Sequence, residues 1–234
     1  MDAVRPAQET HRERIIAAAA RLLAEGGREA VSTRAVSEAA GVQAPTIYRL
    51  FGDKRGLLEA VMTHGFATYV DSKVDREPVA DPVDDLRAGW DQHVAFGLAQ
   101  PALYALIYGE LRPGKPPPAA LAGAEVLARK IRRVAEAGRL RIDEERAAQL
   151  FHAAGSGVTL TLIATPADRR DPALSGLARE AAVAAITTDA PVAATPGPVG
   201  AAVALRAALP QTAALTTNER SLLQEWLERI AQGP

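Results

Sequence analysis

The chain has 234 residues, a formal net charge of −1 at pH 7 and no cysteine. This length suffices for one large or two modest domains, and the near-neutral charge excludes a nonspecific DNA-coating protein. Without cysteine, disulfides, iron–sulfur clusters and thiolate zinc sites are impossible. The N-terminal residues MDAVRPAQETHRER lack the apolar core of a signal peptide, and the longest apolar run, around residues 157–164, is too short to span a membrane. We therefore expect a cytoplasmic protein without a membrane partner.

The first helix is predicted to begin at Thr10. The sequence Thr10-His11-Arg12-Glu13 fits a capping box, which leaves residues 1–9 as a disordered arm. Apolar residues at helical spacing then give the helix one face that needs a partner. These residues are Ile15, Ile16, Ala19, Leu22 and Leu23. Two glycines, Gly26 and Gly27, end the helix because glycine adopts the left-handed C-terminal conformation without a Cβ clash.

Two short helices follow, joined by a turn. Ser32 or Thr33 is a suitable N-cap for the first of them, and Gly41 ends it. The next helix begins near Gln43, because Pro45 fits only in a first helical turn. A short helix, a glycine-containing turn and a second short helix form the layout of a helix-turn-helix DNA reader, although an ordinary helical hairpin gives the same signal.

The second short helix separates these two interpretations. Ile47 and Phe51, at least, are expected to pack on the preceding helices. The outward side chains offer hydroxyl groups, a phenol and positive charges, which suit phosphate oxygens and base edges. They are Gln43, Ala44, Thr46, Tyr48 and Arg49, with Thr33, Arg34 and Lys54 nearby. We therefore predict a DNA-binding domain over residues 1–55 and a second domain over residues 56–234.

The segment from about Arg14 to Val61 resembles the tetracycline-repressor (TetR) family of bacterial transcriptional regulators. The resemblance rests on the glycine pair that ends the first helix, on TRAVSEAAGV, on PTIYRLF and on DKRGLL. It implies an all-α fold with an N-terminal three-helix helix-turn-helix domain and a C-terminal helical ligand-binding and dimerisation domain. It also implies a homodimer that binds a palindromic operator in double-stranded DNA.

The resemblance implies roles for matching residues in the first domain. Thr33 and Arg34 are similar to positions that touch the DNA backbone and sometimes a base. Residues 43–46 occupy the start of the recognition helix, where base edges are read.

Further along the same segment, Tyr48 matches the usual phosphate-binding tyrosine, and Lys54 matches the usual phosphate-binding lysine. Arg49 is expected to reach either a guanine or a phosphate. Leu50 departs from the family pattern, since many relatives carry a polar residue there, so no contact is carried over to it.

The remainder of the chain is predicted to be helical. The predicted helices cover residues 53–74, 83–99, 102–111, 119–137, 144–165, 173–188, 199–209 and 217–231. A proline-rich loop at residues 112–118 and a proline-rich linker at residues 189–198 separate some of them. The last helix starts at the capping box Thr216-x-x-Glu219, and its apolar stripe docks either on its own domain or in a dimer interface.

The predicted helix 144–165 contains the small residues AAGSG at positions 153–157. Small residues let another helix approach closely, within a core or between subunits. The resemblance implies the second role, in which helices 144–165 and 173–188 form a four-helix interface of the homodimer.

The resemblance implies a small-molecule pocket among the helices that follow the first domain. Aromatic residues make up only 4% of the chain, yet they concentrate between positions 66 and 108. Core packing explains any single one, whereas their concentration favours a largely apolar pocket for an apolar or aromatic effector. Trp90, His93 and Tyr108 fit best, because each has a polar tip that needs a partner when buried. The candidate lining residues are Phe66, Tyr69, Trp90, His93, Phe96, Tyr104, Tyr108 and His152.

Other classes of function have less support. The histidines His11, His64, His93 and His152 are scattered, so no metal site and no cofactor are expected. No nucleophile–base pattern, phosphate loop or metal motif indicates an enzyme. We expect a repressor that a small apolar or aromatic effector releases from a palindromic operator. The alternative is a regulator without such an effector, controlled by a protein partner or acting constitutively.

Overall fold

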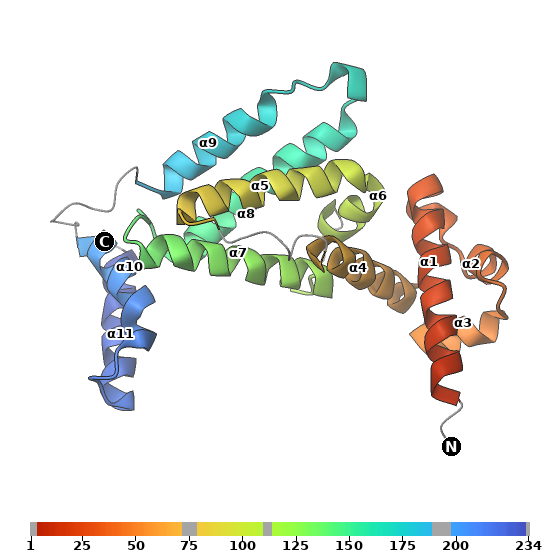
Figure 1. Ribbon diagram of the computed structural model, residues 1–234, viewed down its shortest axis with the longest axis horizontal. Helices are drawn as coiled ribbons and strands as arrows, with labels where there is room; N and C mark the ends of the chain where they lie inside the picture. The colour runs from red at the N-terminus through yellow and green to blue at the C-terminus, as the bar shows by residue number, and fades with distance from the viewer. Residues whose placement is uncertain (1–3, 72–78, 110–113, 189–197, 233–234) are drawn as a thin grey trace. The chain divides into compact units, whose positions relative to one another are not determined.

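The computed structural model describes residues 4–71, 79–109, 114–188 and 198–232, and these form an almost entirely helical chain (Figure 1). Within these ranges no strand occurs, and the backbone pairs only in an isolated antiparallel bridge between Leu140 and Thr187. The predicted all-α fold is therefore confirmed. The chain divides into two compact units, residues 1–76 with 96–122 and residues 77–95 with 123–234. The predicted functional boundary after residue 55 stays a prediction.

The first unit contains α1 (Val4–Ala30), α2 (Thr33–Ala40), α3 (Ala44–Phe51) and α4 (Lys54–Asp71). Its core consists of the apolar faces predicted from helical spacing, and burying each large aliphatic side chain contributes about 1.5–3 kcal/mol. The buried residues include Ile15, Ile16, Ala19, Leu23, Val36, Ile47, Leu57, Leu58, Val61 and Met62.

The helix α1 differs from its prediction at its start. It begins at Val4, so the cap at Thr10 and the disordered arm over residues 4–9 are wrong. Its predicted end is confirmed as a break in the helix, because Gly26 and Gly27 have non-helical dihedral angles. Gly27 lies at a φ of +67°, a region that favours glycine.

The first unit also contains α6 (Pro101–Tyr104), which continues into a single π-helical turn, Ala105–Gly109. Leu103, Tyr104, Leu106 and Ile107 bury their side chains there. The predicted helix over residues 102–111 is therefore not regular α-helix. The parts of predictions that fall on residues 72–74, 110–113 and 189–197 lie outside the described residues.

The second unit contains most of α5 (Pro82–Ala99) and α7 (Pro118–Glu136), together with α8 (Glu144–Ala164) and α9 (Leu174–Ile186). Ion pairs join α5 to its neighbours: Asp85 binds Lys130 of α7 at 2.7 Å, and Asp91 receives two bonds of 2.6 Å from Arg179 of α9. The buried apolar residues of these helices include Val83, Leu86, Trp90, Ile131, Val134, Phe151, Val183 and Ile186.

The helix α8 passes a length-and-composition test for crossing a membrane, the one described helix to do so, and 28% of its apolar window is buried. This test is weak evidence, because core and interface helices also pass it. The small residues of α8 divide between two faces: a Cβ at Gly155 would lie 3.5 Å from the Trp90 ring, whereas a Cβ at Gly157 would meet open space. Core packing therefore explains Gly155, and Gly157 lies on the exposed face.

The second unit ends with α10 (Pro198–Ala208) and α11 (Thr217–Gln232), which pack against each other (Figure 1). The predicted capping box is confirmed: the Thr216 amide donates to the Glu219 carboxylate at 2.9 Å, and the Glu219 amide donates to the Thr216 hydroxyl at 3.3 Å. Leu227 is buried, whereas Leu222, Trp226 and Ile230 are exposed. Packing of α11 on its own domain therefore buries only part of the apolar stripe predicted for this helix.

Candidate nucleic-acid interface

Local signals fix both ends of α2. The Ser32 hydroxyl accepts a hydrogen bond of 3.1 Å from the Ala35 amide, so Ser32 is the N-cap. Gly41 ends the helix in the left-handed conformation, at φ 63° and ψ 41°. The amides of Gly41 and Val42 then bond to carbonyls of the last turn at 3.2 and 3.0 Å. The sequence therefore determines where α2 stops and where the chain turns toward α3.

The turn is also held from α1. The Arg14 guanidinium donates a hydrogen bond to the Ala40 carbonyl, at the C-terminus of α2. A Cβ at Gly41 would lie 3.1 Å from the same guanidinium. A side chain at position 41 would thus meet both an unfavourable φ and a nearby cation, which explains glycine at this position.

The helix α3 presents its polar side chains as expected. Its N-cap, Gln43, makes no side-chain cap bond, and Pro45 lies in the first turn. Ile47 is 1% exposed, whereas Tyr48 is 52% exposed and Arg49 is also exposed. Phe51 is half-buried, and the guanidinium carbon of Arg12 lies 5.7 Å from its ring centroid. One face of α3 is therefore anchored, and the other is available to a partner.

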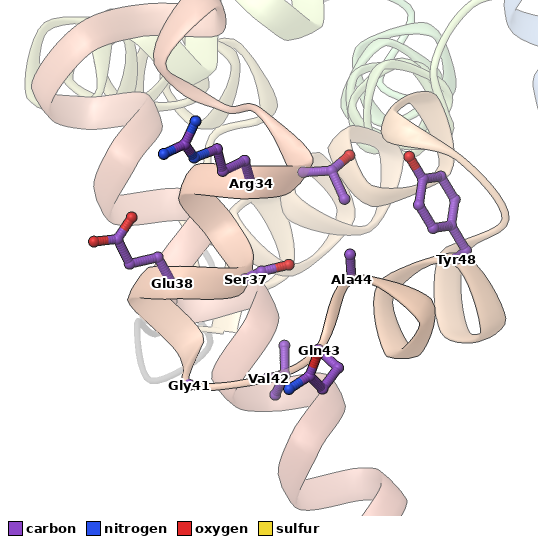
Figure 2. Close-up of a pocket in the computed structure, with 9 residues that line it drawn as sticks. Arg34, Ser37, Glu38, Gly41, Val42, Gln43, Ala44 and Tyr48 are labelled. Atoms are coloured by element: carbon purple, nitrogen blue, oxygen red, sulfur yellow. The ribbon is translucent and has the colours of Figure 1, made fainter.

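An open groove of about 640 Å³ lies between α2 and α3 (Figure 2). Its lining residues are Thr33, Arg34, Ser37, Glu38, Gly41, Val42, Gln43, Ala44 and Tyr48. Five of the predicted DNA contacts are among them. Of the other four, Pro45 and Arg49 are exposed, and Thr46 and Lys54 are half-buried. The structure therefore brings the start of α2 and the start of α3 to one surface.

Ser37 and Glu38 line the groove but were not predicted. Both lie one helical turn after Thr33 and Arg34, so the i, i+4 spacing was the signal that could have identified them. Figure 2 shows the Ser37 side chain directed toward Ala44, whereas Arg34 and Glu38 extend from α2 on the opposite side. The Ser37 hydroxyl is buried and has no hydrogen-bond partner among the described residues. It is thus an unsatisfied polar group beside the groove, whereas most buried polar groups in folded proteins have a partner.

The positively charged side chains near the groove differ in whether they already bind a protein group. The Lys54 ammonium donates to the Arg28 carbonyl at 3.5 Å, and Arg55 pairs with Glu59 at 3.0 Å. The described residues give no ion pair to Arg34 or Arg49, and both side chains are exposed. These two arginines are therefore the cations best placed to bind phosphate or a guanine edge.

The predicted ligand residues form two separate clusters, one in each unit. The first unit holds Phe66, Tyr69, Phe96, Tyr104 and Tyr108. The Tyr69 and Phe96 ring centroids lie 4.4 Å apart, and those of Tyr104 and Tyr108 lie 4.8 Å apart. Burial raises the pKa of the Tyr108 phenol, and the neighbouring phenols of Tyr104 and Tyr69 raise it further. Tyr108 therefore stays protonated and can donate a hydrogen bond.

The second unit holds Trp90, His93 and His152. The Trp90 indole nitrogen donates to the Ser175 hydroxyl at 3.1 Å, so its polar tip already has a partner. The His93 and His152 ring centroids lie 6.4 Å apart. Burial, together with the charge of His152, lowers the pKa of His93 to about 4. Within the described part of the chain, no group of three potential ligands could hold a metal ion.

Comparison with known proteins finds a family match over the first helices. Residues 15–61 match the model of the family described as bacterial regulatory proteins, tetR family, which confirms the resemblance seen in the sequence. The HTH-type transcriptional repressor KstR of Mycobacterium tuberculosis is 40% identical over 74 residues, which are 32% of this chain and 33% of KstR. The chain thus matches about a third of the length of this relative.

Solved structures extend the likeness in fold to most of the chain. A TetR variant from Acinetobacter baumannii in complex with minocycline has a TM-score of 0.56 and 24% identity, over 73% of this chain and 93% of its own. FadR from Bacillus subtilis in complex with stearoyl-CoA has a TM-score of 0.60 and 21% identity, over 73% and 97%. At these identities the likeness shows the fold, in which helical units follow a helix-turn-helix.

Proposed function

We propose that this protein, whose N-terminal domain belongs to the tetR family of bacterial regulatory proteins, is a sequence-specific DNA-binding transcriptional regulator that acts as a repressor. The observation that carries the proposal is the groove between α2 and α3, lined by exposed Arg34 and Tyr48 on helices whose opposite faces are buried. Such a rigid, polar surface suits the major groove of DNA. The matched relative KstR is named as a transcriptional repressor.

The DNA contacts divide into two kinds. Thr33, Tyr48 and Lys54 bind phosphate oxygens and set the position of α3 on the duplex. Gln43 and Thr46 read base edges, Ala44 contacts a thymine methyl group, and Pro45 lies beside them at the start of the recognition helix. Arg34 and Arg49 reach a phosphate or a guanine. Because only a few cations take part, the affinity falls moderately as the salt concentration rises.

A homodimer places two such readers on one palindrome. The exposed surface of α8 includes Leu150, Ala153 and Gly157, and that of α9 includes Leu177 and Ala181. These faces are apolar or small, and their burial against a second copy would remove them from water. A two-fold axis through them presents recognition helices about 34–36 Å apart, which matches successive major grooves.

The effector is proposed to be a small apolar or aromatic molecule. The Tyr104–Tyr108 pair spans the junction between α6 and a π-helical turn, a feature that often marks functional sites. The FadR structure holds stearoyl-CoA and the A. baumannii TetR structure holds minocycline, which supports an effector with a large apolar or ring-bearing part. The helix α4 carries Lys54 at one end and Phe66 and Tyr69 farther along, so a ligand at the aromatic cluster can shift the DNA end.

The shift requires that the effector bind the DNA-incompetent state more tightly than the competent one. A tenfold loss of operator affinity corresponds to about 1.4 kcal/mol of coupling.

The test begins with selection of bound DNA from a random pool by the purified full chain, followed by sequencing. A pseudo-palindrome supports a two-fold reader, and recovery of no motif contradicts sequence-specific binding by the protein alone. Operator affinity is then measured with and without stearoyl-CoA and minocycline. If saturating amounts leave the affinity unchanged, these molecules are excluded as effectors, and regulation without a small molecule becomes the better explanation.

A further inference from the structure

A second cavity, of about 300 Å³, lies in the second unit, where α10 and α11 meet α7 and the start of α8. Three arginines and four carboxylates line it, together with Leu209 and Pro210. It contains none of the aromatic residues discussed above. The cavity is therefore a polar site that the proposed DNA-binding and effector functions do not use.

Three residues that line this cavity carry buried polar atoms without hydrogen-bond partners. The described part of the chain has four such side-chain atoms, and three of them belong to residues lining it: Asp143 Oδ2, Glu144 Oε1 and Arg220 Nε. Asp143 as a whole is 8% exposed. Since buried polar groups in folded proteins are nearly always satisfied, this grouping indicates an occupant.

The rest of each side chain is already engaged, which fixes its orientation. Asp143 Oδ1 accepts from the Arg146 amide at 3.0 Å, and Glu144 Oε2 accepts from Arg132 Nε at 3.0 Å. Arg220 Nη2 donates to the Thr212 carbonyl at 3.0 Å. The unsatisfied atoms are thus parts of fixed groups.

Two of these atoms have cations near them without a hydrogen bond. Asp143 Oδ2 lies 3.4 Å from Arg146 Nε, and Glu144 Oε1 lies 3.8 Å from Arg206 Nη2. The neighbouring cations partly offset the negative charge of the carboxylates, but these two oxygens accept no hydrogen bond from them.

The two kinds of unsatisfied atom define the occupant. The carboxylate oxygens of Asp143 and Glu144 need positively charged N–H donors, and the Arg220 guanidinium needs an anionic acceptor. With three positive and four negative lining groups, the cavity disfavours a ligand of large net charge. We propose that it binds a small zwitterion of the free amino acid class, with the ammonium group at Asp143 and Glu144 and the carboxylate at Arg220.

The size of the cavity agrees with this class. At about 30 Å³ per water molecule, it holds the equivalent of about ten waters, which suits an amino acid. Asp143 is the N-cap of α8 and Arg220 belongs to α11. A zwitterion between them would therefore join the start of α8 to the C-terminal helices and stabilise the folded chain.

The test uses isothermal titration calorimetry of the full chain with the free L-amino acids of proteins, each tested singly, and with butylamine and butyrate as single-charge controls. We expect at least one amino acid to bind more tightly than either control. Glu144→Gln and Arg220→Gln should each weaken that binding by about tenfold to hundredfold. Circular dichroism confirms that each variant is folded before titration.

Matched variants outside the cavity complete the experiment. Glu225→Gln and Arg229→Gln remove the same charges from the exposed α11 pair, which does not line the cavity, and should leave the affinity unchanged. If no amino acid binds the wild-type chain, the cavity holds only water and the proposal is wrong. The proposal is also wrong if the amino acid still binds with unchanged affinity to both Glu144→Gln and Arg220→Gln. It is equally wrong if butylamine binds as tightly as the amino acid. None of these readouts depends on DNA binding.

Discussion

The indole nitrogen of Trp90, on α5, donates a hydrogen bond of 3.1 Å to the hydroxyl of Ser175, at the start of α9. The Trp90 side chain is also edge-on to Phe151 of α8, with ring centroids 5.1 Å apart. This side chain of α5 thus contacts two other helices of the second unit, α8 and α9, and its polar tip needs no ligand. If Trp90 contributes to an effector pocket, it does so as an apolar wall.

Replacing Ser175 by alanine should destabilise the second unit. The change leaves the buried Trp90 N–H without a partner, at a cost of about 1–3 kcal/mol. Urea unfolding measures the effect as a lower midpoint with an unchanged m-value. Ser221→Ala is the control, because Ser221 is exposed and bonds only within its own helix. Equal midpoints for both variants would mean that water replaces the lost bond.

Two substitutions should weaken binding to every DNA sequence by a similar factor. Tyr48→Phe removes a hydroxyl that we propose binds phosphate, and it should lower affinity about threefold to tenfold without changing the salt slope. Lys54→Gln removes a charge that we propose binds phosphate, and it should reduce the slope by about one. Fluorescence anisotropy at several salt concentrations measures both.

The control for this pair is Lys115→Gln, which removes one exposed charge outside the helix-turn-helix. An unchanged slope for Lys54→Gln would indicate that Lys54 serves only to hold the Arg28 carbonyl.

Replacing Thr46 or Gln43 by alanine should change which bases are preferred. A lost contact to one base edge costs about 1–3 kcal/mol of discrimination at that base pair and little elsewhere. Selection from a random pool with each variant, compared with the wild type, measures the change position by position. An identical motif from both variants would show that neither side chain reads a base.

Stability should decline in moderately acidic solution because of His93. Its folded-state pKa of about 4 lies below the ordinary value of 6.5. Between these values the unfolded chain takes up a proton that the folded chain excludes, so stability is complete above pH 6.5 and falls toward pH 4. The loss is at most about 3 kcal/mol.

Thermal or urea unfolding across this pH range, with His93→Gln, measures the contribution of His93. The variant should show a weaker pH dependence between pH 6.5 and 4. His64→Gln is the control because His64 is exposed on α4. His152, which faces His93 from α8, also titrates, so the His152→Gln variant is measured beside it. A His93→Gln curve parallel to the wild type would exclude His93 as the cause.

Gly157→Leu should disrupt the homodimer that we propose. Gly157 lies on the exposed face of α8, where a larger side chain meets open space within one copy but would separate two copies. Sedimentation measures the molecular mass, and Ala67→Leu, on the exposed face of α4, is the control. A dimer that survives this change would mean that this face of α8 is not the interface. Gly155 is unsuitable for the test, because it packs on Trp90 within its own unit.

Sequence alone predicted those features that neighbouring residues determine. Ser32 and Gly41 set the bounds of α2, and the Thr216–Glu219 box sets the start of α11. The burial of Ile47 followed from apolar residues at helical spacing. These effects act within about one turn, so they can be read from a short window of residues.

Features that depend on distant residues were missed or left open. No residue near Ala105 predicts a π-helical turn. Ser37 follows Thr33 by four residues, but this spacing points to the groove only when the position of α3 beside α2 is known. Gly155 lies on the buried face of α8 because it packs on Trp90, whereas Gly157 lies on the exposed face. Trp90 belongs to a different helix and is distant along the chain, so the local sequence could not assign these faces. The grouping of Asp143 with Arg220 likewise requires α11 to pack beside α8.

The bond from Arg14 to the Ala40 carbonyl has a consequence for protein engineering. Transplanting α2 and α3 alone into another scaffold would carry the side chains that we propose read DNA, but it would leave behind the Arg14 clamp that holds the turn at Gly41. A portable reading module therefore has to include α1 from Arg14 onward. The Arg14 clamp binds the Ala40 carbonyl at the end of α2, and no groove residue of α3 takes part in this bond. Substitutions on α3 that aim to change base preference should therefore leave the clamp intact.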